Sequence, residues 1–398
     1  MHPLHPFFPI IIFLIAFVTA YLVRKRYNIT YATGRYECID GMRGFLALSV
    51  FVCHSSVWHR YLQTGLWESP KSTVFTHYGQ TSVVLFFMIT SFLFVSKLLH
   101  AREKGFDFRD FLVSRIYRIA PMYYVSILLL VVCVLFASGW RLHTGIGTFS
   151  KSILNWSFFT INAAPGINNL AFTNRINAGV VWSLAYEWLF YMSLPLISLL
   201  ILKFKPKTSY LILSTLFIIV FALVHPINLY HIYPFIGGSA AAILLHHAPP
   251  TKKINNKVAS VLILFCLLCI VQFRTVNNIA CLFFIAVLFT LIAFGATLFG
   301  LLRNPTLKFL GDICYSTYLL HGILLFMSFY FVIGFSNSRA LSPLQYCLVI
   351  FCITPLVVIA SFIGFRYVEK PFMEKAKRLR KRLNKRLPAV PPLEVVTV

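Results

Sequence analysis

The stretch DGMRGFLALSVFVCH, residues 40–54, begins a hydrophobic helix with Arg43 near its start and His54 eleven residues later. At about 100° and about 1.5 Å per residue, both side chains lie on one face, roughly 16 Å apart along the axis. An ionisable residue inside a membrane helix is costly and therefore indicates a functional site. A cationic residue near one surface and a histidine deeper inside suit an anionic substrate whose reactive end reaches inward.

The composition indicates an integral membrane protein. Hydrophobic residues make up 59% of the 398 residues and charged residues only 12%, against about 25% in soluble proteins. Several apolar stretches are long enough to cross about 30 Å of hydrocarbon. We therefore predict an all-α integral membrane protein, and the predicted spans are 7–24, 44–63, 80–99, 119–139, 180–202, 208–225, 230–247, 257–273, 278–302, 310–334 and 343–366.

Basic residues predict the orientation of the chain. With the N-terminus outside, the inner segments hold 29 of the 36 lysines and arginines, as the positive-inside rule requires. The net charge of +25 is then mostly a topology signal, so we expect contact with anionic lipid and no nucleic-acid partner. The first apolar stretch is followed by its basic residues, the wrong order for a signal peptide, so we expect a retained helix.

The nine cysteines indicate packing rather than chemistry, since none lies in a predicted outer loop where disulfides form. Cys266 and Cys269 have the spacing of metal ligands, but their helix is otherwise apolar and lacks histidine or acidic partners. We therefore expect no metal site and no tightly bound cofactor.

Three titratable residues are predicted at a similar depth in the membrane. Glu187 lies about 12 Å from the outer start of its span, His54 about 16 Å from the inner face, and His321 about eleven residues into its span. Together they suit proton transfer, with Glu187 orienting the imidazole of His54. The alternative for each is structural, because histidines and carboxylates in membrane helices also serve packing and hydrogen bonding.

Arg115 and Arg118 are predicted on the inner side, three residues apart, where two guanidinium groups could hold a phosphate. Basic residues are also expected on any inner loop. The chain contains no G-x-S-x-G elbow, Walker loop, H-E-x-x-H motif or dinucleotide fingerprint. The main alternative to an enzyme is a proton-coupled transporter or a flippase of lipid-linked sugars, although no internal repeat is visible.

Five motifs occur in register: DGMRG with its R-x10-H spacing, RIYRIAPMYY, WSLAYEWLFY, FLGDICYSTYLLHG and YVEKPF. Together they resemble the acyltransferase-3 family of membrane acyltransferases, which O-acetylate bacterial surface polysaccharides and some small molecules. The resemblance implies a bundle of about ten helices over 36–374, preceded by an extra transmembrane helix in 1–35 and followed by a basic tail, 375–398, disordered from 387. It also implies the bacterial inner membrane, and self-association into a homo-oligomer is left open.

The resemblance implies residue roles as well. His54 would be the catalytic histidine, Arg43 its partner, and Arg115 and Arg118 the arginines that bind acyl-CoA, with acetyl-CoA expected as the donor. The acceptor would be a hydroxyl of a cell-surface carbohydrate such as lipopolysaccharide, entering near 140–179. The residues expected to donate hydrogen bonds to the developing oxyanion or to support the substrate are Tyr315, Tyr318, His321 and Trp182.

The chain departs from the family pattern at one motif. It reads SVVLFFMITSFL where many members read GVDLFFVLSGFL, so Val84 replaces an acidic residue and Ser91 a glycine. Any role of that acidic residue is therefore not transferred to this chain.

Overall fold

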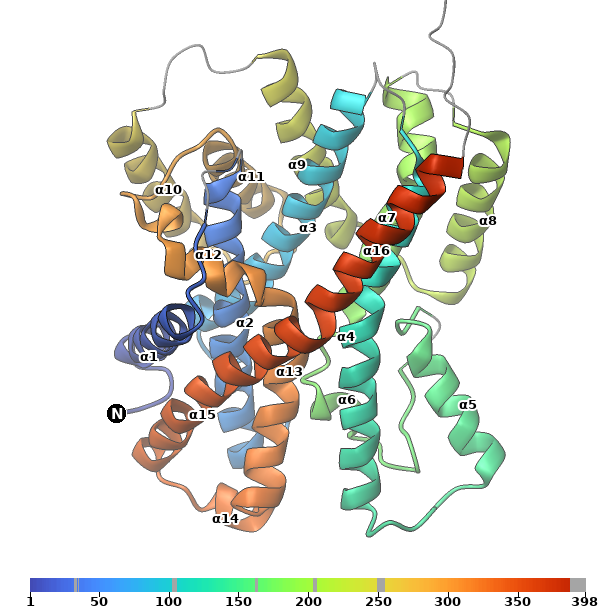
Figure 1. The fold of residues 1–398 in the computed structure, drawn as a ribbon. Coiled ribbons are helices and arrows are strands. Elements are labelled where there is room, and N and C mark those ends of the chain that lie inside the picture. The colour runs from blue at the N-terminus through green and yellow to red at the C-terminus, as the bar shows by residue number, and fades with distance from the viewer. Residues whose placement is uncertain are drawn as a thin grey trace, which may run out of the picture.

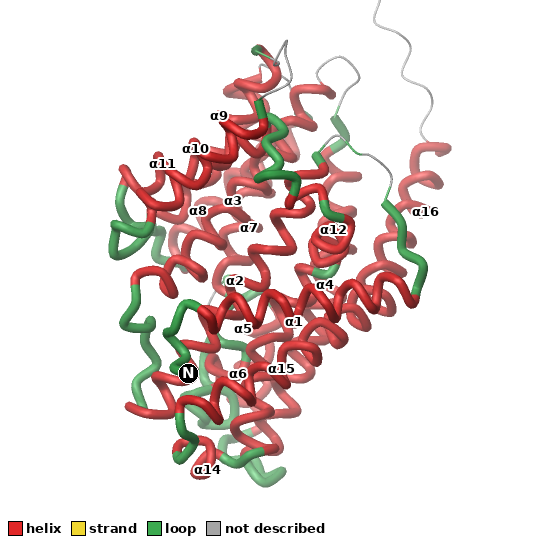
Figure 2. Tube along the Cα trace, turned by 90° about the vertical axis from the view of Figure 1, so that its left-hand side faces the viewer, coloured by secondary structure: helices red, strands yellow, loops and turns green. Residues whose placement is uncertain are grey.

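The computed structural model describes residues 1–31, 34, 36–101, 106–161, 164–202, 206–248 and 255–386, and these residues form helices and their connections without a β-strand (Figures 1 and 2). The predicted disordered tail from residue 387 lies outside them. The α-helices are α1 (Phe7–Arg26), α2 (Glu37–Thr64), α3 (Thr73–Ala101), α4 (Phe108–Ala137), α5 (Ile146–Ser157), α6 (Thr173–Ile176), α7 (Trp182–Leu202), α8 (Thr208–Val224), α9 (Leu229–His247), α10 (Asn256–Ile270), α11 (Ile279–Ala293), α12 (Pro305–Asp312), α13 (Cys314–Met327), α14 (Phe335–Arg339), α15 (Pro343–Gly364) and α16 (Lys370–Arg386). A 3-10 helix, η1 (Leu301–Arg303), and two π-helices, η2 (Ser328–Val332) and η3 (Phe365–Glu369), complete the set.

Every predicted apolar span overlaps one of these helices. Within the described residues, six helices are long and apolar enough to cross a membrane: α1, α3, α4, α7, α13 with η2, and α15 with its continuation. Helices α8, α10 and α11 are apolar but shorter, and α2 and α9 carry polar side chains. The predicted all-α, multi-pass membrane fold is confirmed, although six of the eleven predicted spans meet both criteria.

Two predicted boundaries differ from the structure. Helix α4 begins at Phe108, well before the predicted residue 119, because Asp107 caps it by accepting from the backbone N–H groups of Arg109 and Asp110. The two predicted phosphate-binding arginines therefore belong to this helix rather than to a loop. Helix α11 ends at Ala293, short of the predicted residue 302, and Gly295 follows it with a φ of +103°.

Glycines allow α2 to pack at very short range against η1 and α12. A Cβ added to Gly41 would lie 2.0 Å from the carbonyl oxygen of Leu302 in η1, and one added to Gly311 of α12 would lie 2.0 Å from that of Asp40. Small residues at such crossings let helix backbones approach closely in membranes. The crossing fixes the start of α2, and with it the position of Arg43.

The connection between α4 and α7 folds back into the bundle. Helix α5 returns along α4 to its midpoint, where the hydroxyl of Tyr123 donates to the carbonyl of Trp156 and that of Tyr124 donates to the carbonyl of Ser157 at 3.3 Å (Figure 1). The indole Nε1 of Trp156 then donates to the carbonyl of Pro165 at 2.8 Å. This segment is therefore re-entrant, and α7 begins inside the bundle.

Because the connection before α7 folds back into the bundle, Glu187 does not lie at the predicted depth, which was that of His54 and His321. The start of α7 lies beside α13, because the hydroxyl of Tyr318 donates to the carbonyl of Val180 at 2.8 Å. A Cβ on Gly322 would likewise lie 2.4 Å from the backbone of Asn177. Glu187 is five residues into α7, so it lies about 7 Å further toward the inner side than this start.

The extra N-terminal helix packs on the outside of the bundle. A stripe of buried residues at intervals of four, Phe8, Ile12, Ala16 and Ala20, faces its neighbours. Helix α1 contacts α15 and α12 through this face, and both figures draw it beside α15. The helix is thus docked along its length, while its opposite face is apolar and exposed.

Replacing Gly41 with alanine should lower the thermal unfolding temperature of the detergent-purified protein. The new methyl group would have to displace a backbone carbonyl, and overpacking of this kind typically costs about 1–3 kcal/mol. Gly147→Ala is the matched control, because nothing lies within 4 Å of a Cβ at that position in α5. Equal shifts of both variants would contradict a close contact of α2 with η1.

Candidate active site

The first part of the site is a cavity of about 310 Å³ toward the side of the bundle that the basic residues predict to be the inner one, and we call it the inner cavity. Its walls bring together Arg43 from α2, Arg115 and Arg118 from α4, and Glu187 from α7. The three arginines that the sequence singled out therefore share one cavity, although Arg43 is far from the other two in the chain. A cavity with three guanidinium groups suits a ligand with several negative charges.

The two arginines of α4 have different partners. Arg118 lies 3.9 Å from the carboxylate of Glu369, which is fully buried and accepts from the hydroxyl of Ser316 at 2.5 Å. Arg115 stacks over the ring of Phe94 at 4.8 Å and donates from Nη2 to Oγ of Ser114 at 3.2 Å, while its Nε has no hydrogen-bond partner among the described residues. An unpaired buried donor in a cavity suits an anionic ligand, because unpaired buried polar groups are costly.

Glu187 belongs to the arginine cavity and not to the histidine. The hydroxyl of Tyr191 donates to its Oε2 at 3.1 Å, and both residues line the inner cavity. The expectation that Glu187 orients the imidazole of His54 therefore differs from the structure. A carboxylate here partly balances the arginines instead.

The second part of the site is a cavity of about 350 Å³ that contains His54. Polar and aromatic side chains from the outer loops and from α3, α7 and α9 line this cavity. They include Trp67, Glu68, Gln80, Trp182, Tyr230, His231 and Asn277. Arg43 and His54 share one face of α2 but line different cavities. Arg43 lines the inner cavity, and His54 lines the outer one.

A chain of hydrogen bonds fixes the tautomer of His54. His321 is fully buried, and its Nδ1 lies 2.9 Å from the carbonyl oxygen of Thr317, which can only accept. In the neutral ring, Nε2 of His321 is then an acceptor, and Nδ1 of His54 lies 3.0 Å from it. His54 must therefore carry its proton on Nδ1, which leaves the lone pair of Nε2 available. His321 positions His54, in a role that resembles the orienting group of a catalytic triad.

The predicted oxyanion donors are engaged elsewhere. The hydroxyl of Tyr315 donates to the carbonyl of Ile119 at 2.9 Å, and that of Tyr318 is bound to Val180 and Ser183. Both tyrosines line the inner cavity. Their hydrogen bonds connect α13 to α4 through Tyr315 and to the start of α7 through Tyr318. Since His321 also uses both ring nitrogens, none of the three offers a free donor, in contrast to the expectation.

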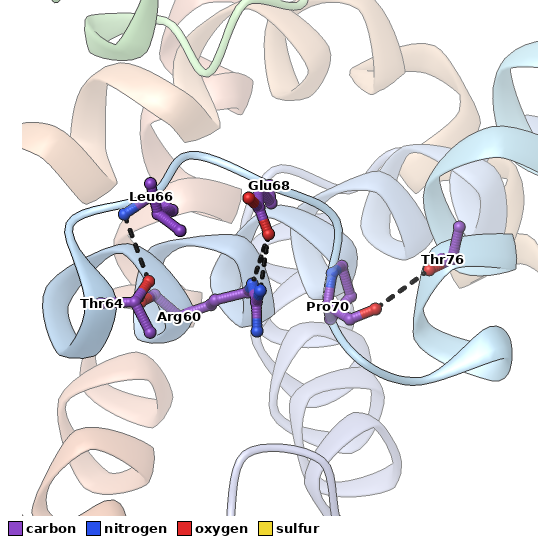
Figure 3. A network of polar contacts seen from close by, with 6 residues as sticks. All are labelled: Arg60, Thr64, Leu66, Glu68, Pro70 and Thr76. Atoms are coloured by element: carbon purple, nitrogen blue, oxygen red, sulfur yellow. Dashed lines mark hydrogen bonds and ion pairs between the residues drawn. The ribbon is translucent and has the colours of Figure 1, made fainter.

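The rim of the outer cavity is a braced loop between α2 and α3. Figure 3 shows the ion pair of Arg60 with Glu68 at 2.5 Å and the bond from Thr76 to the carbonyl of Pro70. Glu68 also lines the cavity, as does Trp182, whose ring lies 4.6 Å from that of His231. The loop thus holds a carboxylate at the entrance.

Sequence reasoning missed several of these residues. Glu68, Gln80, His231 and Asn277 carry no motif, and only the fold brings them to His54. Glu369 is different, because it is the acidic residue of the YVEKPF motif and that motif could have indicated it.

Comparisons with known proteins agree with this geometry. The acyltransferase-3 family, described as an acyltransferase domain, matches residues 36–364. "Putative peptidoglycan O-acetyltransferase YrhL" from Bacillus subtilis (strain 168) is 31% identical over 171 residues, which cover 40% of this chain and 23% of that relative. The chain thus spans less than a quarter of the relative's length, and no solved structure matches significantly.

The family match covers every residue that lines the two cavities except Met373. It favours an enzyme over the transporter or flippase that the sequence left open. The chain belongs to the acyltransferase-3 family.

Proposed function

We propose that the protein transfers an acyl group, most simply acetyl, from cytoplasmic acyl-CoA to a carbohydrate hydroxyl on the outer side of a bacterial inner membrane. The observation that carries this proposal is the pair of chambers on α2, one with three arginines and one with His54. A donor with charged phosphates and a distant thioester matches two adjoining chambers whose Arg43 and His54 lie about 16 Å apart along α2.

The inner cavity would bind the phosphates of the donor. Arg43, Arg115 and Arg118 supply planar guanidinium groups, which bind phosphate oxygens in pairs. The flexible pantetheine arm then extends along α2 toward His54 and brings the thioester into the outer cavity.

His54 would act through its unprotonated Nε2. As a general base, Nε2 removes the proton of the acceptor hydroxyl while the oxygen attacks the thioester carbon; the C–S bond breaks and the proton passes to the thiolate. As a nucleophile, Nε2 attacks the thioester carbon, and the C–S bond breaks to release CoA as the thiolate. The hydroxyl oxygen then attacks the acyl carbon, the bond between that carbon and Nε2 breaks, and the hydroxyl proton passes to the thiolate. Both routes need the tautomer that His321 imposes.

The outer cavity has the chemistry of a carbohydrate site. Trp67 and Trp182 offer aromatic faces, while Glu68, Gln80 and Asn277 offer groups that bind hydroxyls. The YrhL relative, named for peptidoglycan O-acetylation, supports a glycan acceptor, and lipopolysaccharide carries hydroxyls of the same kind.

Arg115→Lys should weaken the binding of CoA about tenfold, since lysine lacks the planar fork of arginine. Isothermal titration calorimetry of purified protein with CoA measures the dissociation constant. Arg109→Lys is the control, because Arg109 lies on the same helix but is exposed and lines neither cavity. An unchanged dissociation constant in an Arg115→Ala/Arg118→Ala double variant would show that these arginines do not bind CoA and only follow the positive-inside rule.

His54→Gln should reduce acyl transfer at least about 100-fold, because glutamine cannot accept and return a proton. His321→Ala should fall between wild type and His54→Gln and should alter the pH profile of the rate without changing CoA affinity. The assay follows labelled acetyl from acetyl-CoA into envelope carbohydrate by membranes that contain each variant. His59→Gln, on the same helix but outside both cavities, controls for general damage. Substantial transfer by His54→Gln would contradict the proposed mechanism.

The two cavities should open to opposite sides of the membrane. In a variant without native cysteines, Ser69→Cys should react with an impermeant maleimide in intact cells, and Met373→Cys only after lysis. CoA should protect Met373→Cys and leave Ser69→Cys reactive, since these residues line different cavities. Labelling of both positions from one side would overturn the arrangement.

A further inference from the structure

The predicted outer side of the protein is electrically positive. Its segments hold seven lysines and arginines but one acidic residue, Glu68. The positive-inside rule limits lysine and arginine on this side and places no such limit on aspartate and glutamate. Topology therefore does not explain the shortage of carboxylates, and a positive surface attracts anionic ligands.

Three of the seven cations have partners in the protein. Arg60 forms the ion pair with Glu68 at 2.5 Å, so this pair carries no net charge (Figure 3). Arg175 donates from Nη1 to the hydroxyl of Tyr61 at 2.9 Å, and Arg339 donates from Nε to a backbone carbonyl of α2 at 3.2 Å. These contacts fix the outer end of α2, so a structural role accounts for all three.

Lys71 and Arg274 differ from these three. Both are exposed, and neither forms an ion pair or a side-chain hydrogen bond with another residue that the structure describes. Ser69, two residues before Lys71, and Val276, two residues after Arg274, both line the outer cavity. The two free cations therefore lie on the loops 65–72 and 271–278, which border the cavity of His54.

Hydrogen bonds hold both loops at the same end of α3. The hydroxyl of Thr76 donates to the carbonyl of Pro70 at 3.4 Å, and Nε2 of His77 donates to the carbonyl of Phe273 at 2.7 Å. Thr76 and His77 are adjacent in the first turns of α3. Each free cation directly follows one of the two residues whose carbonyl accepts, so both stand beside the outer end of this helix.

We propose that Lys71 and Arg274 bind an anionic group of the acceptor, so that the enzyme acylates a glycan that carries carboxylate or phosphate groups. The inference rests on the proposed function and names its acceptor class. The reacting hydroxyl lies at Nε2 of His54, while the charged group lies on the loops at the entrance. Arg60, six residues beyond His54 on α2, marks this entrance about 9 Å further out along the helix axis.

The test reverses the charge of the two loops. A Lys71→Glu/Arg274→Glu variant should lower the transfer of labelled acetyl from saturating acetyl-CoA into envelope carbohydrate at least about tenfold, because like charges at a binding surface oppose association. Higher salt should slow the wild type but not the variant, since salt screens the attraction between exposed charges. CoA affinity, measured calorimetrically, should equal that of wild type, because the inner cavity is unchanged.

Arg141→Glu/Lys151→Glu is the matched control. These two cations are exposed and belong to 140–179, the segment expected for acceptor entry, but they line neither cavity. The control should transfer acetyl at the wild-type rate. An equal loss in both double variants, or a wild-type rate in Lys71→Glu/Arg274→Glu, would overturn the inference.

The charge of the product gives a second measurement. Labelled oligosaccharides released from the envelope carbohydrate should be retained by an anion-exchange column at neutral pH, and label in neutral oligosaccharides alone would overturn the inference. So would stabilisation of the wild type, but not of the charge-reversed variant, by phosphatidylglycerol vesicles with transfer unchanged, because the cations would then bind lipid head groups. Absence of any transfer by folded wild type that binds CoA would instead contradict the proposed function.

Discussion

The contact of α2 with α12 is the constraint on which the site depends. Helix α2 supplies both Arg43 and His54, so the position of its start sets the place of each. The backbones of the two helices approach so closely at Gly44 and Gly311 that no side chain fits between them. Without an apolar driving force between helices in lipid, close packing of this kind is a main source of association. The glycines of DGMRG and FLGD thus serve the active site through geometry.

Buried charge imposes the second constraint. Glu369 is fully buried at the end of η3, where a π-helix joins α15 to α16, and Arg118 lies beside it. Removal of one partner from a buried pair leaves a charge without compensation, which typically costs about 3–5 kcal/mol. Arg115 has no carboxylate in an ion pair with it: its Nη2 donates to Oγ of Ser114 at 3.2 Å, its guanidinium stacks on Phe94, and its Nε has no partner among the described residues. The two neighbouring arginines thus differ in how the protein balances their charge.

The sequence predicted the parts of the site that depend on spacing within one helix. The common face of Arg43 and His54 and the pairing of Arg115 with Arg118 follow from helical geometry. The depth of Glu187 could not be predicted, because the 140–179 connection returns into the bundle and shifts the start of α7. The prediction that His321 donates a hydrogen bond to the oxyanion was also wrong, because its two ring nitrogens are engaged with Thr317 and His54. Such contacts depend on how helices pack, which one sequence does not contain.

The separation of the two cavities has an electrical consequence. In the proposed reaction the phosphates remain with the arginines on one side, and only the uncharged acyl group and pantetheine arm pass Val83, Phe87 and Tyr318, which line both cavities. Moving one elementary charge through a membrane potential requires about 2.3 kcal/mol per 100 mV. Transfer of a neutral group does no such work, so its equilibrium is independent of the voltage across the membrane.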